Sequence, residues 1–215
     1  MKLQDVLPED IERRSMEIIT EELGDRVLDP ENEAVIKRVI HTTADFEYAD
    51  RLVFSPEAVR RGVDALCRGA SIVTDTEMAR AGINKRVLGR LGGTAYCFVA
   101  DSGVAEEAKR NGTTRSAAAM QKAARELSGG PLIVAIGNAP TALIELEKLL
   151  DAGAIHPDLV IGVPVGFVNA EESKERFLSR RDVPYIIARG RKGGSNVAAA
   201  ICNALLYQSG SRTAP

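Results

Sequence analysis

The chain is poor in the residues that cross-link, ligate metals or stack on bases. In 215 residues it has three cysteines, two histidines, no tryptophan and an aromatic content of only 4%. Cys67, Cys97 and Cys202 are odd in number, far apart and without C-x-x-C spacing. This pattern argues against a disulfide framework and a structural zinc site, and it favours a reducing cytoplasm. With only His41 and His156 present, a multi-histidine metal centre is excluded.

Long apolar runs and an excess of one charge are also missing. No run approaches the roughly 18 apolar residues of a membrane span, so we expect no membrane association. Residues 1–10 lack the basic-then-apolar profile of a signal peptide. Thirty acidic and 28 basic residues leave a net charge of −2, which does not favour nucleic acid as a partner. The scarcity of aromatic residues argues against a stacking platform for single strands.

The remaining composition, 45% apolar and 27% charged, is that of an ordinary globular protein. Short continuous runs rich in Val and Ile are typical of strands covered on both faces, and they lie at 52–54, 71–74, 95–100, 132–136, 159–162 and 185–188. Helical patterns alternate with them at 9–24, 31–43, 56–68, 75–81, 114–128, 140–152, 171–178 and 195–207.

This alternation predicts a single α/β domain over residues 1–215, with a mostly parallel sheet of about five to six strands and helices on both faces. We expect the first and last eight or so residues to be peripheral. Pro140 marks the first position of one helix, and Gly153 is placed to end it. Ser55-Pro56-Glu57 is expected to open another helix in the same way.

Ligands of such sheets bind beyond the carboxyl ends of the strands. Three loops of small residues follow the last three apolar runs, at 137–141, 162–167 and 189–195, and they should converge on one edge. The third loop precedes a helix that begins near Ser195, and its bases are Arg189, Arg191 and Lys192. Together with Gly193-Gly194 this suits an anion. The alternative is a plain turn with solvated bases, because neither Walker A nor G-x-G-x-x-G spacing is present.

Three further positions offer chemistry, each with a structural alternative. Arg115 lies in the first turn of a helix that Thr113 or Thr114 can cap, where it either meets an anion or is simply exposed. Asp75 supplies a carboxylate after a strand or caps the next helix. His41 ends a helix, and Asp45 or a threonine hydroxyl could orient it as a general acid or base. Alternatively, His41 is only stabilised by the helix dipole.

Several motifs occur together in a specific order: Arg13-Arg14-Ser15, Val39-Ile40-His41-Thr42-Thr43-Ala44-Asp45-Phe46, Asp75-Thr76-Glu77-Met78, Gly82-Ile83-Asn84-Lys85-Arg86, Thr114-Arg115-Ser116-Ala117-Ala118, Gly137-Asn138-Ala139-Pro140-Thr141-Ala142, Gly162-Val163-Pro164-Val165-Gly166-Phe167-Val168, Glu172-Ser173-Lys174 and Gly190-Arg191-Lys192-Gly193-Gly194-Ser195-Asn196. In this order they resemble the precorrin-8X methylmutase family, over nearly the whole chain. The second and fourth motifs resemble the cobalt-handling, oxygen-independent branch of that family most.

The resemblance implies an isomerase of cobalamin biosynthesis that moves the C-11 methyl group of a corrin precursor to C-12, giving cobyrinate or its metal-free counterpart. It implies that His41 donates or accepts the proton and that the enzyme is a homodimer with active sites near the interface. No external methyl donor, redox cofactor or catalytic metal is expected. Expected substrate contacts are Ser15, Thr42, Asp75, Lys85, Arg86, Arg115, Asn138, Thr141, Arg191, Lys192, Gly193 and Ser195.

The expected substrate carries many acetate and propionate groups, which gives the bases of these loops a purpose. The alternative function is a tetrapyrrole carrier or chaperone that holds the macrocycle without chemistry, because the same loops would serve both. A nucleotide-dependent enzyme is a third possibility, but the chain lacks the phosphate-binding fingerprint of that class.

Overall fold

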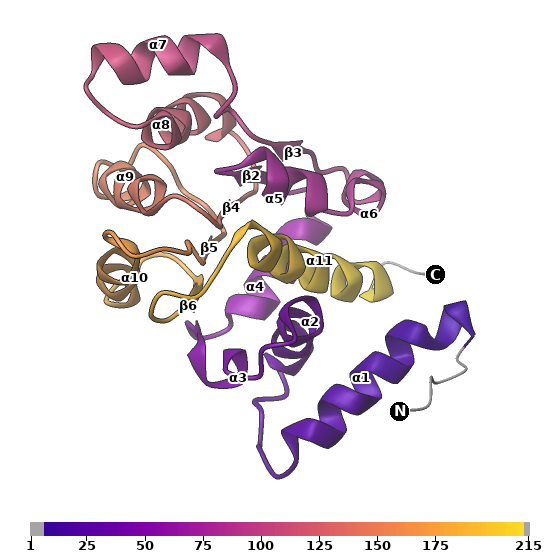
Figure 1. Ribbon diagram of the computed structural model, residues 1–215. Coiled ribbons are helices and arrows are strands. Elements are labelled where there is room, and N and C mark those ends of the chain that lie inside the picture. The colour runs from indigo at the N-terminus through magenta and orange to yellow at the C-terminus, as the bar shows by residue number, and fades with distance from the viewer. Residues whose placement is uncertain (1–6, 213–215) are drawn as a thin grey trace.

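Six strands form one sheet in the computed structural model, which describes residues 7–212 (Figure 1). The strand order is β1-β6-β5-β4-β2-β3. The strands are β1 Leu52–Phe54, β2 Ser71–Thr74, β3 Ala95–Tyr96, β4 Leu132–Ile136, β5 Leu159–Gly162 and β6 Tyr185–Ala188. All neighbours pair in parallel except β1, which runs antiparallel to β6. The predicted mostly parallel sheet is confirmed.

Helices cover both faces of the sheet, as predicted (Figure 1). The first face carries α2, α4, α5, α6 and α11, with α1 packed outside α2, and the second carries α7 to α10. The helices are the 3₁₀ turn η1 Pro8–Asp10, then α1 Ile11–Leu23, α2 Glu33–Thr43, α3 Tyr48–Arg51, α4 Ala58–Cys67, α5 Glu77–Gly82, α6 Lys85–Arg90, α7 Ser102–Arg110, α8 Arg115–Leu127, α9 Pro140–Asp151, α10 Ala170–Leu178 and α11 Ser195–Arg212.

The two-sided burial explains why the strands are apolar without interruption. In β4, Ile133 and Ala135 pack into the core on the first face. Leu132, Val134 and Ile136 pack into the core on the second face. Since successive side chains of a strand point to opposite faces, a strand covered by helices on both sides has no polar position.

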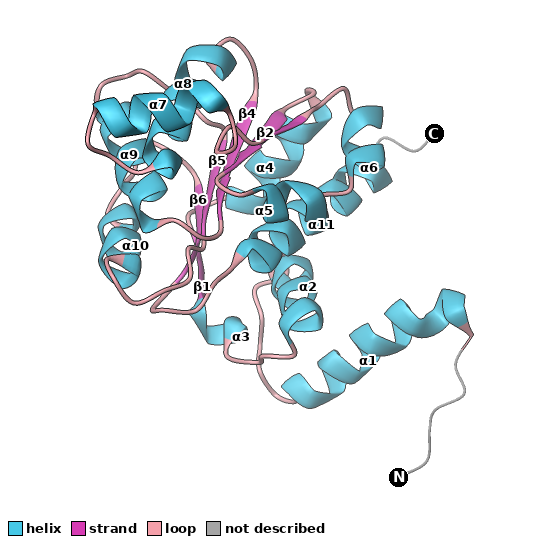
Figure 2. Ribbon diagram, turned by 45° about the horizontal axis from the view of Figure 1, so that its top comes forward, coloured by secondary structure: helices cyan, strands magenta, loops and turns pink. Residues whose placement is uncertain are grey.

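Helix α11 lies centrally on the first face, beside α2, α4 and α5 (Figure 2). Ala198, Ile201 and Leu205 are buried in the core of that face, so this apolar stretch belongs to the core. The helix continues past the expected end at residue 207 to Arg212. None of the described helices combines the length and the apolar character that a membrane span requires.

Two local predictions were wrong, and three helices were missed. The predicted strand 95–100 ends at Tyr96, because the chain turns where Asp101 N–H donates to Phe98 O. The helix expected from residue 56 starts at Ala58, and the Ser55 hydroxyl accepts a hydrogen bond from Tyr185 N–H instead of capping that helix. Helices α3, α6 and α7 were not predicted: α3 and α6 are short, and the buried Val104 and Ala108 of α7 give only a weak apolar stripe.

The topology determines where a ligand site can form. Chain order reverses between β2 and β4: β3 continues outward on one side of β2, whereas β5 and β6 continue on the other side of β4. In open α/β sheets, ligands bind at such a reversal, beyond the carboxyl ends of the strands. The loops that follow β2, β4, β5 and β6 therefore form the candidate site.

Candidate active site

The loops that follow β4, β5 and β6 are bonded to one another through their backbones. Val165 N–H donates to Gly137 O at 3.3 Å, and Gly194 N–H donates to Val163 O at 2.9 Å. At Gly193, where φ is +158°, a Cβ atom would lie 2.1 Å from Val163 O, so only glycine fits. The predicted convergence of the three loops on one edge is confirmed.

The buried carboxylate of Asp75 holds the loop after β4 by hydrogen bonds to its backbone. Its side chain is 0% exposed and accepts hydrogen bonds from Gly137, Asn138 and Ala139 N–H at 2.8, 2.9 and 2.7 Å. Burial raises the pKa of Asp75, and the three amide donors act against this rise. Since both oxygens of the buried carboxylate accept backbone N–H groups of one loop, Asp75 holds that loop in place.

The helix cap after β2 is Thr76 and not Asp75. Thr76 Oγ1 accepts a hydrogen bond from Ala79 N–H at 3.1 Å and lies 2.8 Å from Ser195 Oγ. This contact ties the start of α5 to the start of α11. It places Ser195 at the carboxyl edge, as predicted, and leaves its hydroxyl shared with Thr76.

His41 lies in the last turn of α2, and its ring is held by a residue of α1. Ser15 Oγ is 2.8 Å from His41 Nδ1. The hydroxyls of Thr42 and Thr43 donate to backbone carbonyls one turn earlier, and the Asp45 carboxylate bonds elsewhere. The expectation that Asp45 or a threonine orients the ring was therefore wrong: Ser15 does so, from 26 positions earlier in the chain.

This arrangement leaves one ring nitrogen for chemistry. His41 is exposed, and Nε2 has no partner among residues 7–212. With Nδ1 accepting from the Ser15 hydroxyl, Nε2 carries the proton; with Nδ1 donating, Nε2 is the base. The pair can thus donate or accept a proton at Nε2.

Lys192 connects the loop after β6 to the segment that follows His41. Its Nζ lies 2.5 Å from Asp45 Oδ2 and 3.1 Å from Glu47 Oε1. The hydrogen bond from Lys192 holds the pKa of Asp45 below its usual value, and the same bond raises the pKa of Lys192. This partly exposed ion pair joins the segment that follows α2 to the loop after β6.

The remaining predicted bases divide into two groups. Arg191 lies with its guanidinium 5.4 Å from the centre of the Phe167 ring. Arg115 is exposed at the start of α8, beside Thr114, whose Oγ1 is 2.8 Å from Thr141 Oγ1. Neither arginine has a carboxylate partner among the described residues. Asn138, in the loop before α9, is exposed as well, so these residues face the solvent at the carboxyl edge.

Lys85 and Arg86 begin α6 and are exposed. The neighbouring Asn84 N–H donates to Asn203 Oδ1 at 2.8 Å. Asn203 lies about two turns along α11 from Ser195, roughly 12 Å. The structure therefore does not place this pair against the bases of the loop after β6. Arg189, the other base of that loop, is bonded to Glu175 by two contacts of 2.9 Å.

Lys174 was missed as a functional position. Its side chain is 0% exposed, and Nζ donates to Pro164 O and to Lys192 O, each at 3.0 Å. Burial lowers the pKa of Lys174 to about 8. A signal was present in the sequence: with Ala170 and Phe177, Lys174 occupies the i, i+4, i+7 stripe of α10 that faces the core.

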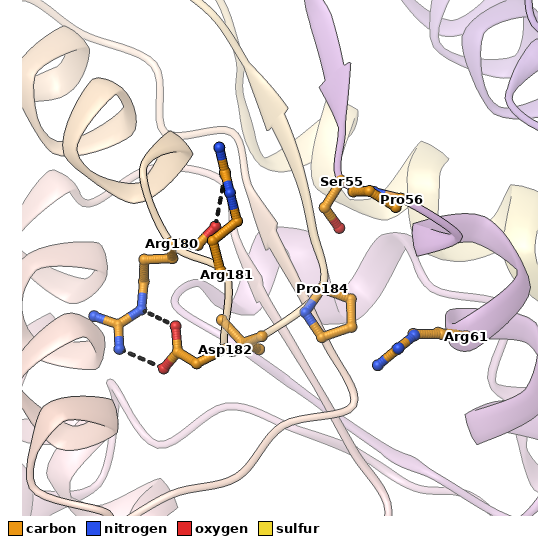
Figure 3. A pocket seen from close by; sticks show the side chains of 8 residues that line it. Ser55, Pro56, Arg61, Arg180, Arg181, Asp182 and Pro184 are labelled. Atoms are coloured by element: carbon orange, nitrogen blue, oxygen red, sulfur yellow. Dashed lines mark hydrogen bonds and ion pairs between the residues drawn. The ribbon is translucent and has the colours of Figure 1, made fainter.

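The cavity near the amino ends of β5 and β6 offers little for a ligand. Its volume is about 170 Å³, and it lies at the opposite edge, lined by Ser55, Arg61 and Pro184 among others (Figure 3). It is smaller than typical ligand pockets. Its Arg180 is already bonded to Asp182 at 2.6 and 3.0 Å. Within residues 7–212, no three His, Cys, Asp or Glu side chains are grouped as a metal site would require.

Comparison with known proteins identifies the family. The model of the precorrin-8X methylmutase family matches residues 10–208. The chain belongs to this family. Cobalt-precorrin-8 methylmutase of Priestia megaterium is 48% identical to this methylmutase over 93% of this chain and 88% of its own length. The protein of the same name from Salmonella typhimurium is also 48% identical, over 93% of this chain and 95% of its own.

A solved structure agrees with the fold of this methylmutase. The precorrin-8X methylmutase of Thermus thermophilus superposes with a TM-score of 0.85 at 36% identity, covering 95% of this chain and 100% of the other. The predicted family and the predicted α/β architecture are both confirmed. Methylmutases are isomerases, since they move a methyl group within one molecule.

Proposed function

We propose that this methylmutase moves the methyl group at C-11 of cobalt-precorrin-8 to C-12, giving cobyrinate. The observation that carries the proposal is the exposed Nε2 of His41, whose ring is oriented by Ser15. Both relatives that are 48% identical carry the cobalt name, which favours the cobalt-containing substrate over its metal-free counterpart.

The outward side chains of this edge suit a flat apolar macrocycle with a rim of carboxylates. Phe167 and Val168 are each 80% exposed, and Arg191 lies over the Phe167 ring. Arg191 and Arg115 bind peripheral acetate or propionate groups, because each is free to pair with a carboxylate. Asn138, Thr141, Ser195 and the Gly193 backbone add polar contacts around them.

In the proposed reaction, His41 Nε2 delivers a proton to the periphery of the conjugated system of the substrate, because the ring nitrogens are bound to cobalt. Protonation makes the conjugated system electron-poor, so the C-11–methyl bond breaks as the C-12–methyl bond forms. The proton then returns to His41. Because the shift is intramolecular, it uses no external methyl donor, redox cofactor or catalytic metal. A general acid supplies about 10²–10⁴-fold, and orientation of the ring by the loops supplies the rest.

The enzyme acts in the cytoplasm as a homodimer, as the family resemblance implies, without a nucleic acid or membrane partner. Helix α1 projects from the body of the molecule (Figure 2). The large apolar side chains of Leu7 and Ile11, at its start, are 63% and 56% exposed. A second copy would cover them near Ser15. Sedimentation equilibrium should give twice the mass of one chain; a monomeric mass at all concentrations would refute this part.

An ultraviolet-visible time course with cobalt-precorrin-8 tests the function. Conversion of the spectrum to that of cobyrinate is the expected result. Binding of the substrate without a change to the spectrum of the isomer would instead identify a tetrapyrrole carrier. A thermal-shift screen with NAD and ATP should show no stabilisation, because the loops lack a nucleotide-binding fingerprint.

Replacing Phe167 by alanine should raise KM about tenfold and leave kcat within about threefold of wild type. Covering an aromatic side chain contributes roughly 1.5–3 kcal/mol, and this contact is the same in substrate and transition state. Steady-state kinetics in the same assay measure both constants. The control is Val27→Ala, which removes a 97% exposed side chain between α1 and α2. An unchanged KM for the Phe167 variant would exclude contact with the substrate.

A further inference from the structure

Lys174 carries a charge that the core of a protein ordinarily excludes. Its side chain is fully buried, and it forms no ion pair with any described residue. Burying an ammonium group without a carboxylate is costly, so its acceptors matter. The lowered pKa, about 8, has burial as its first cause. Its acceptors are two backbone carbonyls, Pro164 O and Lys192 O.

These carbonyls belong to different loops of the site. Pro164 is in the loop after β5, three residues before Phe167, and Lys192 is in the loop after β6, next to Arg191. The two loops also share the hydrogen bonds from Gly194 N–H to Val163 O and from Gly166 N–H to Arg191 O, at 2.9 and 3.2 Å. The ammonium group is therefore the one buried side chain described here that bonds both loops at once.

We propose that Lys174 is a positioning residue: its ammonium group holds the loops after β5 and β6 together, so that Phe167 and Arg191 face the substrate as one unit. The part of this inference that concerns the substrate rests on the proposed function. The part that concerns the two loops does not. A methionine of similar length would fill the same core volume, but it would leave both carbonyls without a donor.

Residue-resolved hydrogen exchange of the full-length Lys174→Met variant tests the role in the loops. The amides of Gly194 and Gly166 should exchange at least about tenfold faster than in the wild type, because their partners lie in the loops that have been released. The amides of β4 should exchange at the same rate in the variant and in the wild type. The matched control is Lys148→Met, since Lys148 is 67% exposed and its ammonium group pairs with Glu145, away from the two loops.

Kinetics of the same variants test the consequence for the substrate. Lys174→Met should raise KM about tenfold or more and change kcat by less than about threefold. A lysine with a merely structural role would lower the melting temperature and leave KM at 25 °C unchanged. Lys174→Gln keeps N–H donors without the charge, so it should restore part of the lost affinity. If Lys174→Met does not fold, the exchange and kinetic measurements are made on Lys174→Gln instead.

Each outcome decides a separate question. Unchanged exchange at Gly194 and Gly166 would overturn the positioning role, whatever the enzyme does. Failure of both variants to fold would overturn it as well, because Lys174 would then hold the whole fold and not two loops. Faster exchange with an unchanged KM would keep the link between the loops but refute their use by the substrate, and with it that part of the proposed function.

Discussion

Replacing His41 by alanine is expected to lower kcat by about 10²–10⁴-fold, the contribution of a general acid. Product affinity should stay within about threefold of wild type, because the bases that would bind the carboxylates are unaffected. The reason lies in the geometry: only Nε2 of His41 is free to exchange a proton, since Nδ1 is bonded to Ser15 Oγ at 2.8 Å. Single-turnover conversion of cobalt-precorrin-8 and a spectroscopic titration with cobyrinate give the two quantities.

Two companion variants show what the loss means. Ser15→Ala should lower kcat less, by about tenfold, because the ring remains but is no longer oriented. His156→Ala, which removes an exposed histidine next to Pro157, should have no effect. A His41→Ala enzyme that loses product affinity as much as turnover would contradict the acid–base role and make His41 a binding residue.

Replacing Asp75 by asparagine should lower the free energy of unfolding by about 3–5 kcal/mol. The three amides that bond to its carboxylate would face an amide group that cannot accept from all of them. Urea denaturation followed by circular dichroism measures the loss. As the control, Asp50→Asn removes an exposed carboxylate that pairs with Arg26 and should cost less than about 1 kcal/mol.

The Asp75 variant also separates the two interpretations of that residue. If Asp75 only holds the loop after β4, Asp75→Asn should mainly lower the free energy of unfolding. Any change in KM should then be small and should come from displacement of that loop. A fully stable variant with a strongly raised KM would instead mean that the carboxylate contacts the substrate.

The arrangement of strands and helices could largely be predicted, because a strand buried on both faces is an uninterrupted apolar run in the sequence. The run 132–136 is apolar at every position, and both of its faces are covered. The converging loops followed from parallel pairing alone. Helix α7 was missed because only Val104 and Ala108 mark its buried side. The antiparallel β1 was also beyond prediction, since strand direction is set by pairing with β6 and leaves no mark in three residues.

Contacts between residues far apart in the chain were harder to predict than the identity of the functional residues. His41 was identified, but its partner Ser15 depends on how α1 packs on α2, which neither helix encodes alone. Lys174 and Asp75 lie in motifs that the resemblance uses, yet their burial follows from tertiary packing. A charged residue at a core position of an amphipathic helix, as at Lys174, is the one signal that could have been used.

The buried charges at the two sides of the site have a consequence for protein engineering. Asp75 accepts hydrogen bonds from the amides of one loop, and Lys174 donates hydrogen bonds to carbonyls of two others. None of these bonds involves an outward-facing side chain. The course of the backbone is thereby independent of Phe167, Arg191 and Asn138. These positions form a replaceable set: libraries confined to them can be screened for other carboxylated macrocycles while the framework is left intact.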